Sequence, residues 1–429
     1  MTDAAKTLTE GTFDLLTDDS EAPARDITGA ARAAEPGNFL RHAGALSLSK
    51  LADGLIDPKL VLSWLMGALG APSALIGLLV PVRESGALLP QLFTAPHIRA
   101  MGRRKWAWAG GALGQGLSAL AILLAALTLQ GWAAGIAIVA ALGVLAVARS
   151  VCSVSYKDVL GKTVDKARRG TVTGLAGSVA AGGVLVFAAL LLSGMVARFD
   201  LVLWAIGLAG LFWIAAAFIF ATICEEDAPG EEVAGIGLRQ VSLLWRDGDL
   251  GRFVLARILL LPTALAPPYL VLLANRAGDE RFGVLGALVL ASSLAGFASS
   301  WVWGRLSDRS SRLVLSISGA VAAAFLALAV GLDAAGQMGT FWAAPVALFG
   351  LMISYQGVRL GRSTYLVDVA PRDDRAVYTA VANTSVGVAL LAAGGLAALT
   401  ASFGPALTLG VFAAIAAAGA ALAITLREA

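Results

Sequence analysis

The chain has 429 residues, of which 58% are hydrophobic and only 14% are charged. Soluble globular domains carry about 25% charged residues, so this composition excludes an ordinary soluble protein and predicts an integral membrane protein. The formal net charge is only +3, and most Lys and Arg residues fall in alternating gaps between apolar runs. That distribution indicates membrane topology and argues against a nucleic-acid partner.

The N-terminal segment, residues 1–40, is polar and acidic. It lacks the basic start and apolar core that are typical of a signal peptide. We expect it to form a mobile cytoplasmic tail.

Twelve membrane-spanning helices are predicted after this tail, because a span needs about 20 mostly apolar residues. Their ranges are 42–67, 73–97, 105–129, 131–155, 170–195, 199–223, 250–275, 281–303, 313–332, 339–366, 375–399 and 402–426. Hydropathy alone would draw a single span at 60–81 in place of the first two. An internal repeat favours two, since moving spans 7 and 8 back by about 209 residues gives 41–66 and 72–94.

A polar, acidic gap at residues 225–249 divides the spans into two sets of six. We interpret it as a cytoplasmic linker between an N-terminal half, residues 41–224, and a C-terminal half, residues 250–429. The repeat supports this division, because YKDVLGKTVDKARRGTVTG at 156–174 resembles YLVDVAPRDDRAVYTAVAN at 365–383. The predicted fold is therefore an all-α integral membrane protein with twelve transmembrane helices in two six-helix pseudo-repeat halves.

Basic residues concentrate in the gaps that follow even-numbered spans. The gaps between spans 1 and 2, 3 and 4, and 11 and 12 hold no Lys or Arg. Because basic loops stay on the cytoplasmic side, this bias places the even gaps and both termini in the cytoplasm. We expect a multi-pass protein of the cytoplasmic (inner) membrane, surrounded by the lipid bilayer.

Two of these basic turns resemble each other and a known signature. Residues 95–105 read APHIRAMGRRK, and residues 304–312 read GRLSDRSSR. Both are similar to G-x-L-x-D-R-x-G-R-K, which transporters of the major facilitator superfamily carry between spans 2 and 3 and often echo between spans 8 and 9. The matching residues are Gly102, Arg103 and Arg104 in the first turn, and Gly304, Leu306, Asp308, Arg309 and Arg312 in the second.

The resemblance covers about residues 40–426 and implies a secondary transporter whose halves rock around a site near the midplane. It also implies that these turns act as a gating latch in the outward-open state. Asp308 can face a helix N-terminus, where negative charge is favoured. The first turn departs from the signature, because Ala95 stands for its first Gly and Arg99 for its Asp. Since Arg99 cannot accept the same hydrogen bonds, simple anchoring at the membrane surface is the alternative for that turn.

Ionisable residues inside spans are costly, so each is a candidate functional group. Span 1 carries Lys50, Asp53 and Asp57, whose spacing places them on one helix face. Asp57 precedes Pro58, which disfavours helical geometry and predicts a broken helix. We consider Asp53 and Asp57 proton-coupling candidates, with a structural Lys50–Asp53 ion pair as the alternative.

Span 2 carries Arg83 and Glu84 side by side. Adjacent residues lie about 100° apart on a helix, so each needs a partner from another helix. Asp53 or Asp57 is the expected partner of Arg83. Glu84 is the third proton-coupling candidate.

Four arginines could bind an anionic substrate, namely Arg149, Arg257, Arg359 and Arg362. We expect Arg149 and Arg362 to serve the cytoplasmic gate, and Arg257 to be the cavity charge of the C-terminal half. The full set of expected substrate-cavity residues is Lys50, Arg83, Arg257, Tyr269, Tyr355 and Gln356.

These features favour a monomeric secondary transporter of a small molecule, with protons as the coupling ion. A non-transporting assembly factor or sensor of the same fold is the alternative, because the first turn is degenerate. No nucleophile–base constellation and no metal-ligand spacing is visible, so neither an enzyme nor a cofactor is expected. The charges permit an anion, a zwitterion or an amphipathic substrate.

Overall fold

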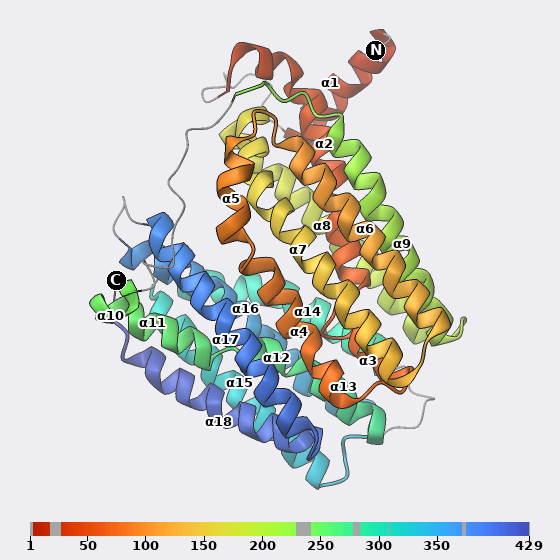
Figure 1. Cartoon of the computed structure of the whole chain (residues 1–429), viewed down its shortest axis with the longest axis vertical. Coiled ribbons are helices and arrows are strands. Elements are labelled where there is room, and N and C mark those ends of the chain that lie inside the picture. The colour runs from red at the N-terminus through yellow and green to blue at the C-terminus, as the bar shows by residue number, and fades with distance from the viewer. Residues whose placement is uncertain are drawn as a thin grey trace.

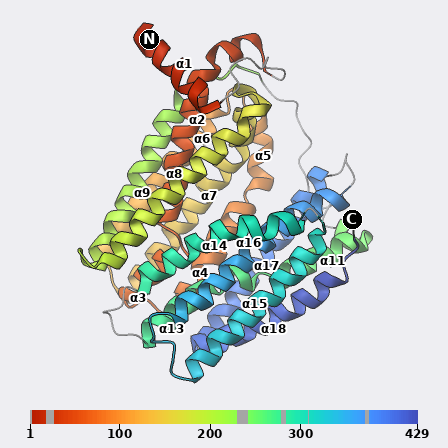
Figure 2. The ribbon, with the colours of Figure 1, turned by 180° about the vertical axis from the view of Figure 1, so that it is seen from behind.

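The computed structural model describes residues 3–17, 27–228, 242–277, 284–307, 309–370 and 375–428, and the regular structure in these ranges is helical. Figures 1 and 2 show two bundles of helices that meet along part of their length. The first bundle, with its N-terminal extension, contains α1 (Asp3–Thr17), α2 (Gly29–Leu55), α3 (Val61–Ala68), α4 (Ser73–Leu88), α5 (Gln91–Ala100), α6 (Lys105–Thr128), α7 (Gly131–Thr163), α8 (Lys166–Ser193) and α9 (Arg198–Ala221). The second contains α10 (Leu243–Arg246), α11 (Gly248–Leu259), α12 (Pro262–Leu265), α13 (Pro267–Ala277), α14 (Val284–Ser307), α15 (Ser311–Ala334), α16 (Ala343–Val369), α17 (Arg375–Ala401) and α18 (Pro405–Ile424).

Every predicted span coincides with one helix or with a helix that is broken near its middle. Within the described ranges, nine helices are long and apolar enough to cross a membrane, and the bent pair α4–α5 would make ten. The apolar part of α14 is shorter, at Val284–Ser299. Length and composition therefore support nine or ten spans directly, and the number twelve is approximate.

Span 1 is broken where the sequence predicts it. Helix α2 ends at Leu55 and α3 begins at Val61. Between them, the carboxylate of Asp57 accepts hydrogen bonds from the backbone N–H groups of Lys59 at 2.8 Å and Leu60 at 3.0 Å. These two bonds fix the turn that leads from the end of α2 into α3, as aspartate side chains commonly do in turns.

Span 7 is broken twice, into α11, α12 and α13. Both later segments begin with proline, at Pro262 and Pro267. Proline lacks a backbone N–H and fits the first position of a helix, so each one starts a new segment more readily than it continues an old one.

Small residues let the helices of each bundle approach closely. A Cβ on Gly116 of α6 would lie 2.8 Å from the carbonyl oxygen of Gly210 on α9. In the second bundle, a Cβ on Gly319 of α15 would lie 2.9 Å from the Cβ of Ala420 on α18. Close backbone approach maximises packing between helices in a medium where lipid is as apolar as the side chains.

Each bundle has two distinct ends. The basic end carries the turns α5–α6, α7–α8 and α14–α15 together with the chain termini, and the far end carries the tight turns at Gly70, Gly131, Gly194, Gly336 and Gly404. The two bundles converge near α3 and α13 and diverge toward their basic ends (Figures 1 and 2).

The halves touch most extensively along two helix pairs, α4 with α17 and α8 with α14, and also where α12 and α13 meet α3 and α4. Ser85 of α4 donates to the carbonyl oxygen of Gly387 on α17 at 3.0 Å. At the far end, a Cβ on Gly67 would lie 3.7 Å from Nδ2 of Asn275 on α13. A cavity of about 530 Å³ also lies there, lined by Trp64, Gly67, Ala68, Ala197, Arg198, Phe199, Ala274, Asn275, Val284 and Leu285.

The N-terminal segment is partly helical. Residues 3–17 form α1, and α2 already begins at Gly29. Phe13 is buried, and its ring packs edge-on against Phe39 of α2 with centroids 5.3 Å apart. The guanidinium of Arg168 lies 4.9 Å from the Phe13 ring. The segment thus contains a helix that contacts the first bundle through Phe13, and its mobility and cytoplasmic location stay predictions.

Candidate functional site

Asp53 of α2 lies between two arginines of neighbouring helices. Arg83 of α4 donates to its Oδ1 at 2.8 Å, and Arg149 of α7 donates to its Oδ2. Of the two partners expected for Arg83, the structure selects Asp53. It also places Arg149 in this group, whereas the sequence assigned it to the gate. One carboxylate thus links three helices of the first bundle.

The other two charged residues of span 1 have partners in the backbone. Lys50 donates to the carbonyl oxygen of Thr173 on α8 at 3.0 Å, and no Lys50–Asp53 ion pair forms in the described structure. Asp57 holds the break between α2 and α3, as described above. Because its acceptor Oδ1 already binds two N–H groups, Asp57 has a structural task whatever else it does.

Glu84 of α4 differs from both aspartates. It makes no hydrogen bond or ion pair with any residue in the described part of the chain, and yet four cations act on its carboxylate electrostatically. These are Lys59, Arg83, Arg359 and Arg362, two from each half. Glu84 is therefore the acidic side chain that faces the most positive surroundings without being committed to one partner.

Tyr355 of α16 lies where the halves meet. The ammonium of Lys59 is 3.4 Å from the centroid of its ring, and the guanidinium of Arg359 is 5.8 Å from it. Lys59 is only 7% exposed. A cation over an aromatic face gains stability when it is desolvated, so this stack ties span 1 to span 10. The neighbouring Gln356 is half-buried against Gly296 of α14.

Arg257 of α11 is buried in the second half. Its Nη2 donates to Oδ1 of Asn383 on α17 at 3.2 Å, but its Nε has no hydrogen-bond partner among the described residues. Arg362 lies near enough to repel it electrostatically. A buried guanidinium with a neutral partner and a cationic neighbour is a strained electrostatic arrangement.

Tyr269 does not line an open cavity, contrary to expectation. It is fully buried on α13, with its ring edge-on to Phe412 of α18 at a centroid distance of 5.8 Å. Its hydroxyl lies 2.1 Å from the place that a Cβ on Gly77 of α4 would take. Tyr269 is a packing contact between the halves, made possible by the missing side chain of Gly77.

Together these residues form what we call the central charge group. It draws on α2, the break after it, α4, α7, α11 and α16, and consists of Lys50, Asp53, Asp57, Lys59, Arg83, Glu84, Arg149, Arg257, Arg359 and Arg362. Within the described ranges, no cluster of three or more His, Cys, Asp or Glu side chains could hold a metal ion. The group is rich in charged side chains and draws them from both halves.

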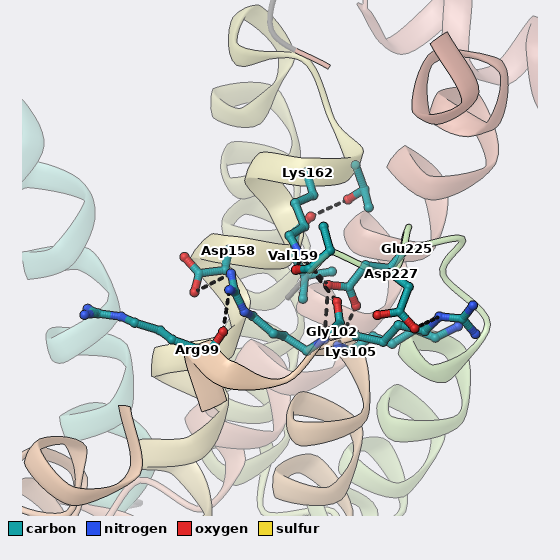
Figure 3. Close-up of polar contacts among 12 residues, drawn as sticks. Arg99, Gly102, Lys105, Asp158, Val159, Lys162, Glu225 and Asp227 are labelled. Atoms are coloured by element: carbon teal, nitrogen blue, oxygen red, sulfur yellow. Dashed lines mark hydrogen bonds and ion pairs between the residues drawn. The ribbon is translucent and has the colours of Figure 1, made fainter. Parts of the chain in front are cut away.

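A second polar site lies at the basic end of the first half (Figure 3). Glu225, just after α9, accepts hydrogen bonds from the backbone N–H groups of Arg104 at 3.1 Å and Lys105 at 2.8 Å. Its side chain is fully buried, and Nζ of Lys162 lies 3.6 Å from it. Glu225 therefore caps the N-terminus of α6, where a negative charge is stabilising.

Arg104 joins the first basic turn to α7. One of its Nη atoms lies 3.2 Å from the carboxylate of Asp158, and the other donates to the carbonyl oxygen of Arg99 at 2.7 Å. Figure 3 shows the side chain of Arg99 extended away from these contacts. Arg99 therefore contributes only its backbone where the family signature has an aspartate.

The segment that follows α9 packs closely against the first basic turn at Gly102, where there is no side chain in the way. A Cβ on it would lie 1.8 Å from Oδ1 of Asp227, and its carbonyl oxygen accepts a hydrogen bond from Nζ of Lys162 at 3.3 Å. Arg103 lies 3.7 Å from the other oxygen of Asp227, but both side chains are more than half exposed. Exposed pairs contribute about 0–1 kcal/mol, so Glu225 is the main anchor of this turn.

The second basic turn is only partly described. Asp308 lies outside the described residues, Gly304 is helical in α14, and Arg309 is exposed in the turn. The N-cap of α15 is Ser310, whose hydroxyl oxygen accepts a hydrogen bond from the N–H of Leu313 at 3.3 Å. Ser310 therefore caps α15, and the role that the sequence suggests for Asp308 stays a prediction.

Arg312 connects this turn to the end of the chain. It donates to the carboxylate of Glu428 at 3.0 Å and to the carbonyl oxygens of Leu426 and Ile424 at 3.3 and 3.4 Å. Cations are favourable at a helix C-terminus, and these carbonyls lie at the C-terminal end of α18. Each basic turn thus contributes an arginine, but Arg104 binds α7 in the first half whereas Arg312 binds the end of α18 in the second.

Several residues of both sites were not identified from the sequence. Lys59 stands between Pro58 and the apolar start of α3, and a lysine inside an apolar run is the signal that could have found it. Glu225 is the first acidic residue after span 6, and Asn383 closes the second copy of the repeat. Asp158 carries no signal in the sequence that separates it from other surface carboxylates.

Solved structures with a similar arrangement of helices include several transporters. No protein-family model and no protein of curated function matches the sequence. The structure is similar to the nucleoside transporter NupG, with a TM-score of 0.66 and 13% identity, over 90% of this chain and 98% of that one. It is similar to a POT family transporter solved with 5-aminolevulinic acid, with a TM-score of 0.66 and 11% identity, over 89% and 94% of the two chains.

A D-xylose-proton symporter is also similar, with a TM-score of 0.69 and 11% identity, over 91% of this chain and 98% of that one. At these identities the likeness concerns the fold alone. It covers nearly the full length of each transporter, so it includes both halves and their relation. The chain therefore has the fold of the major facilitator superfamily transporters, the family that its basic turns resemble.

Proposed function

We propose that this protein is a secondary active transporter that moves a small molecule across the cytoplasmic membrane by alternating access. The observation that carries the proposal is the central charge group, which is assembled from both halves at the place where they meet. Intramembrane charges are retained where they line a substrate or ion pathway. The transporters with the same fold are a second support, since their halves surround a site in this position.

We further propose Glu84 as the main proton carrier, ahead of the other two candidates, Asp53 and Asp57. Asp53 is held by two arginines and Asp57 by two backbone N–H groups, whereas Glu84 has no fixed partner among the described residues. A carboxylate binds and releases a proton during a transport cycle when its burial or its charged neighbours change, and four cations drawn from both halves give Glu84 neighbours that can change.

The basic ends of both halves and the chain termini are assigned to the cytoplasm by the distribution of Lys and Arg. The halves converge at the far end and diverge at the basic end (Figure 1), so the structure corresponds to a state closed toward the outside. The first basic turn, with Gly102, Arg103 and Arg104, and the second, with Gly304, Asp308, Arg309 and Arg312, remain the candidate gates. The working unit is a monomer.

Crosslinking at the far end tests alternating access. Cys152 and Cys224 are first replaced by Ser, and Gly67→Cys with Asn275→Cys is then introduced, because these positions touch across the halves. A disulfide should trap the state closed at the far end. Thiol reagents should then reach a reporter Ser363→Cys on α16 from the basic side at all times, and reduction should restore protection in part of the population.

If the reporter reacts to the same extent with and without the crosslink, the halves do not alternate and a static scaffold of the same fold is the better description. Proton coupling is tested separately, by Glu84→Gln in proteoliposomes under a pH gradient. Gradient-driven accumulation of a transported substrate should be lost, with exchange retained. Glu226→Gln, at an exposed position after α9, is the matched control.

A further inference from the structure

We infer that the substrate is an organic anion whose carboxylate or phosphate group binds between Arg257, Arg362 and Lys59. This inference rests on the proposed function and adds the class of substrate. It begins from the balance of charge in the central charge group. The group holds seven cationic side chains and three carboxylates, which leaves a surplus of four positive charges over the group as a whole.

Most of the negative charge in the group is already committed within the first half. Asp53 binds both Arg83 and Arg149. The bonded oxygen of Asp57 accepts the N–H groups that begin α3. Glu84 is then the one carboxylate of the group left to balance the cations that the second half contributes.

Those cations are concentrated where the two halves face each other. Arg359 and Arg362 lie one turn apart on α16, and Lys59 reaches the same helix by stacking on Tyr355. Both arginines act electrostatically on Glu84. Arg359 is exposed, but Lys59 and Arg257 are buried and Arg362 is half-buried. A single carboxylate cannot neutralise these last three cations together, and uncompensated charge inside a membrane protein is strongly unfavourable.

Arg257 points to where the missing negative charge belongs. It is 5% exposed, and its Nε has no hydrogen-bond partner among the described residues. Its Nη2 donates to the neutral amide oxygen of Asn383, and its charged neighbour is Arg362. An anion that accepted the Nε–H of Arg257 would supply the absent acceptor and relieve the repulsion with Arg362 in one step.

Carboxylates of the basic end are engaged elsewhere and do not neutralise this surplus. Asp158 pairs with Arg104, and Glu225 caps α6. Asp247 accepts the hydroxyl of Tyr378. These three carboxylates of the described residues are therefore not available to the group. A transported anion would supply the counter-charge in the way that a cycle requires, because Lys59 and Arg362 belong to different halves.

Thermal unfolding of the purified protein tests the inference with matched probe pairs, since a ligand that binds the folded state raises Tm. The pairs are succinate with succinamide, benzoate with benzamide, and glycerol 3-phosphate with glycerol, all at equal ionic strength in sodium chloride. At least one acid should raise Tm while its neutral partner does not. The chloride background separates specific binding from general anion screening.

Variants then localise the effect. Arg257→Gln should raise the Kd of the acid that stabilises the protein at least tenfold. Arg257→Lys should recover part of the lost affinity because it keeps the charge. Arg252→Gln on the same helix, at an exposed position, is the matched control and should leave the Kd unchanged.

The inference is overturned if a neutral partner stabilises the protein as well as its acid, or if the Kd of the acid is unchanged in Arg257→Gln. It is also overturned if no probe acid raises Tm in a protein whose crosslinked form has shown alternating access. Failure of the crosslinking experiment itself would instead remove the proposed function, so the two results are distinguishable.

Discussion

The guanidinium of Arg83 donates to the carboxylate of Asp53 across 2.8 Å and joins α4 to α2. The same carboxylate accepts Arg149 from α7, so one acidic group holds two cations of separate helices. The three side chains keep between 14% and 31% of their surface exposed. Removal of any one of the three would leave a largely buried charge without its full set of partners, and this would lower the stability of the fold.

Asp53→Asn should lower the free energy of unfolding by about 2–3 kcal/mol, because it leaves two largely buried guanidinium groups without a counter-charge. Chemical unfolding in detergent measures this change. The double variant Asp53→Asn with Arg83→Gln should be less destabilised than the sum of the single variants, which reports the coupling directly. Asp200→Asn, exposed at the far end, should change stability by less than about 0.5 kcal/mol. Additive single effects would contradict the pairing.

Removal of the Glu225 carboxylate should destabilise the start of α6. Glu225→Ala takes away the acceptor of two backbone N–H groups, and loss of an N-terminal cap costs about 0.5–2 kcal/mol. Hydrogen exchange should accelerate at the amides of Arg104 and Lys105. In Glu226→Ala, the exposed neighbour, those amides should remain protected; equal acceleration in both variants would show that Glu225 is not the cap.

Acidification should weaken the start of the second half through Asp247. Burial is the largest single influence on this carboxyl and opposes its ionisation. Hydrogen bonds from the Tyr378 hydroxyl and from the N–H groups of Leu250 and Asp249 together outweigh burial and lower the pKa of Asp247. A lowered pKa means stabilisation that is present above the unfolded value of about 3.9 and is lost as pH falls through the folded value.

The variant that reports this effect is Asp247→Asn, which keeps a capping oxygen but removes the charge. Its Tm should be lower than that of the parent protein at pH 7, and the difference should shrink below about pH 4. Tyr378→Phe should show a smaller difference with the same pH dependence. A difference in Tm that stays constant from neutral to acidic pH would exclude Asp247 as the titrating group.

Detachment of α1 should follow from a single truncation. Phe13→Ala removes the ring that packs on Phe39 and lies under Arg168, and a helix of this length is marginal in water without docking. In a hydrogen-exchange experiment, the backbone amides of α1 should lose their protection, and those of α2 should keep it. Leu15→Ala, at a position that is 84% exposed, is the control. Retained protection in Phe13→Ala would mean that other contacts dock the helix.

The sequence predicted much of the architecture but little of the pairing. The breaks at Asp57 and around Pro262 follow from proline chemistry, and the segment boundaries follow from hydropathy. Charge in the gaps predicted which ends share a side. The sequence could not predict that Arg149 pairs with Asp53, or that Tyr269 packs against Gly77. Both contacts depend on which helices are neighbours and on which of their faces meet.

What the sequence by itself determined is therefore each segment's relation to its solvent: an apolar run must lie in lipid, a proline must interrupt a helix, and a basic turn must stay at the surface. Only the tertiary structure decided which charges meet. Glu225 caps a helix that begins 120 residues earlier, and Arg257 binds an asparagine 126 residues later. The reason is physical, since solvation acts on a segment alone, whereas an ion pair inside a membrane is set by the rotation and depth of two packed helices.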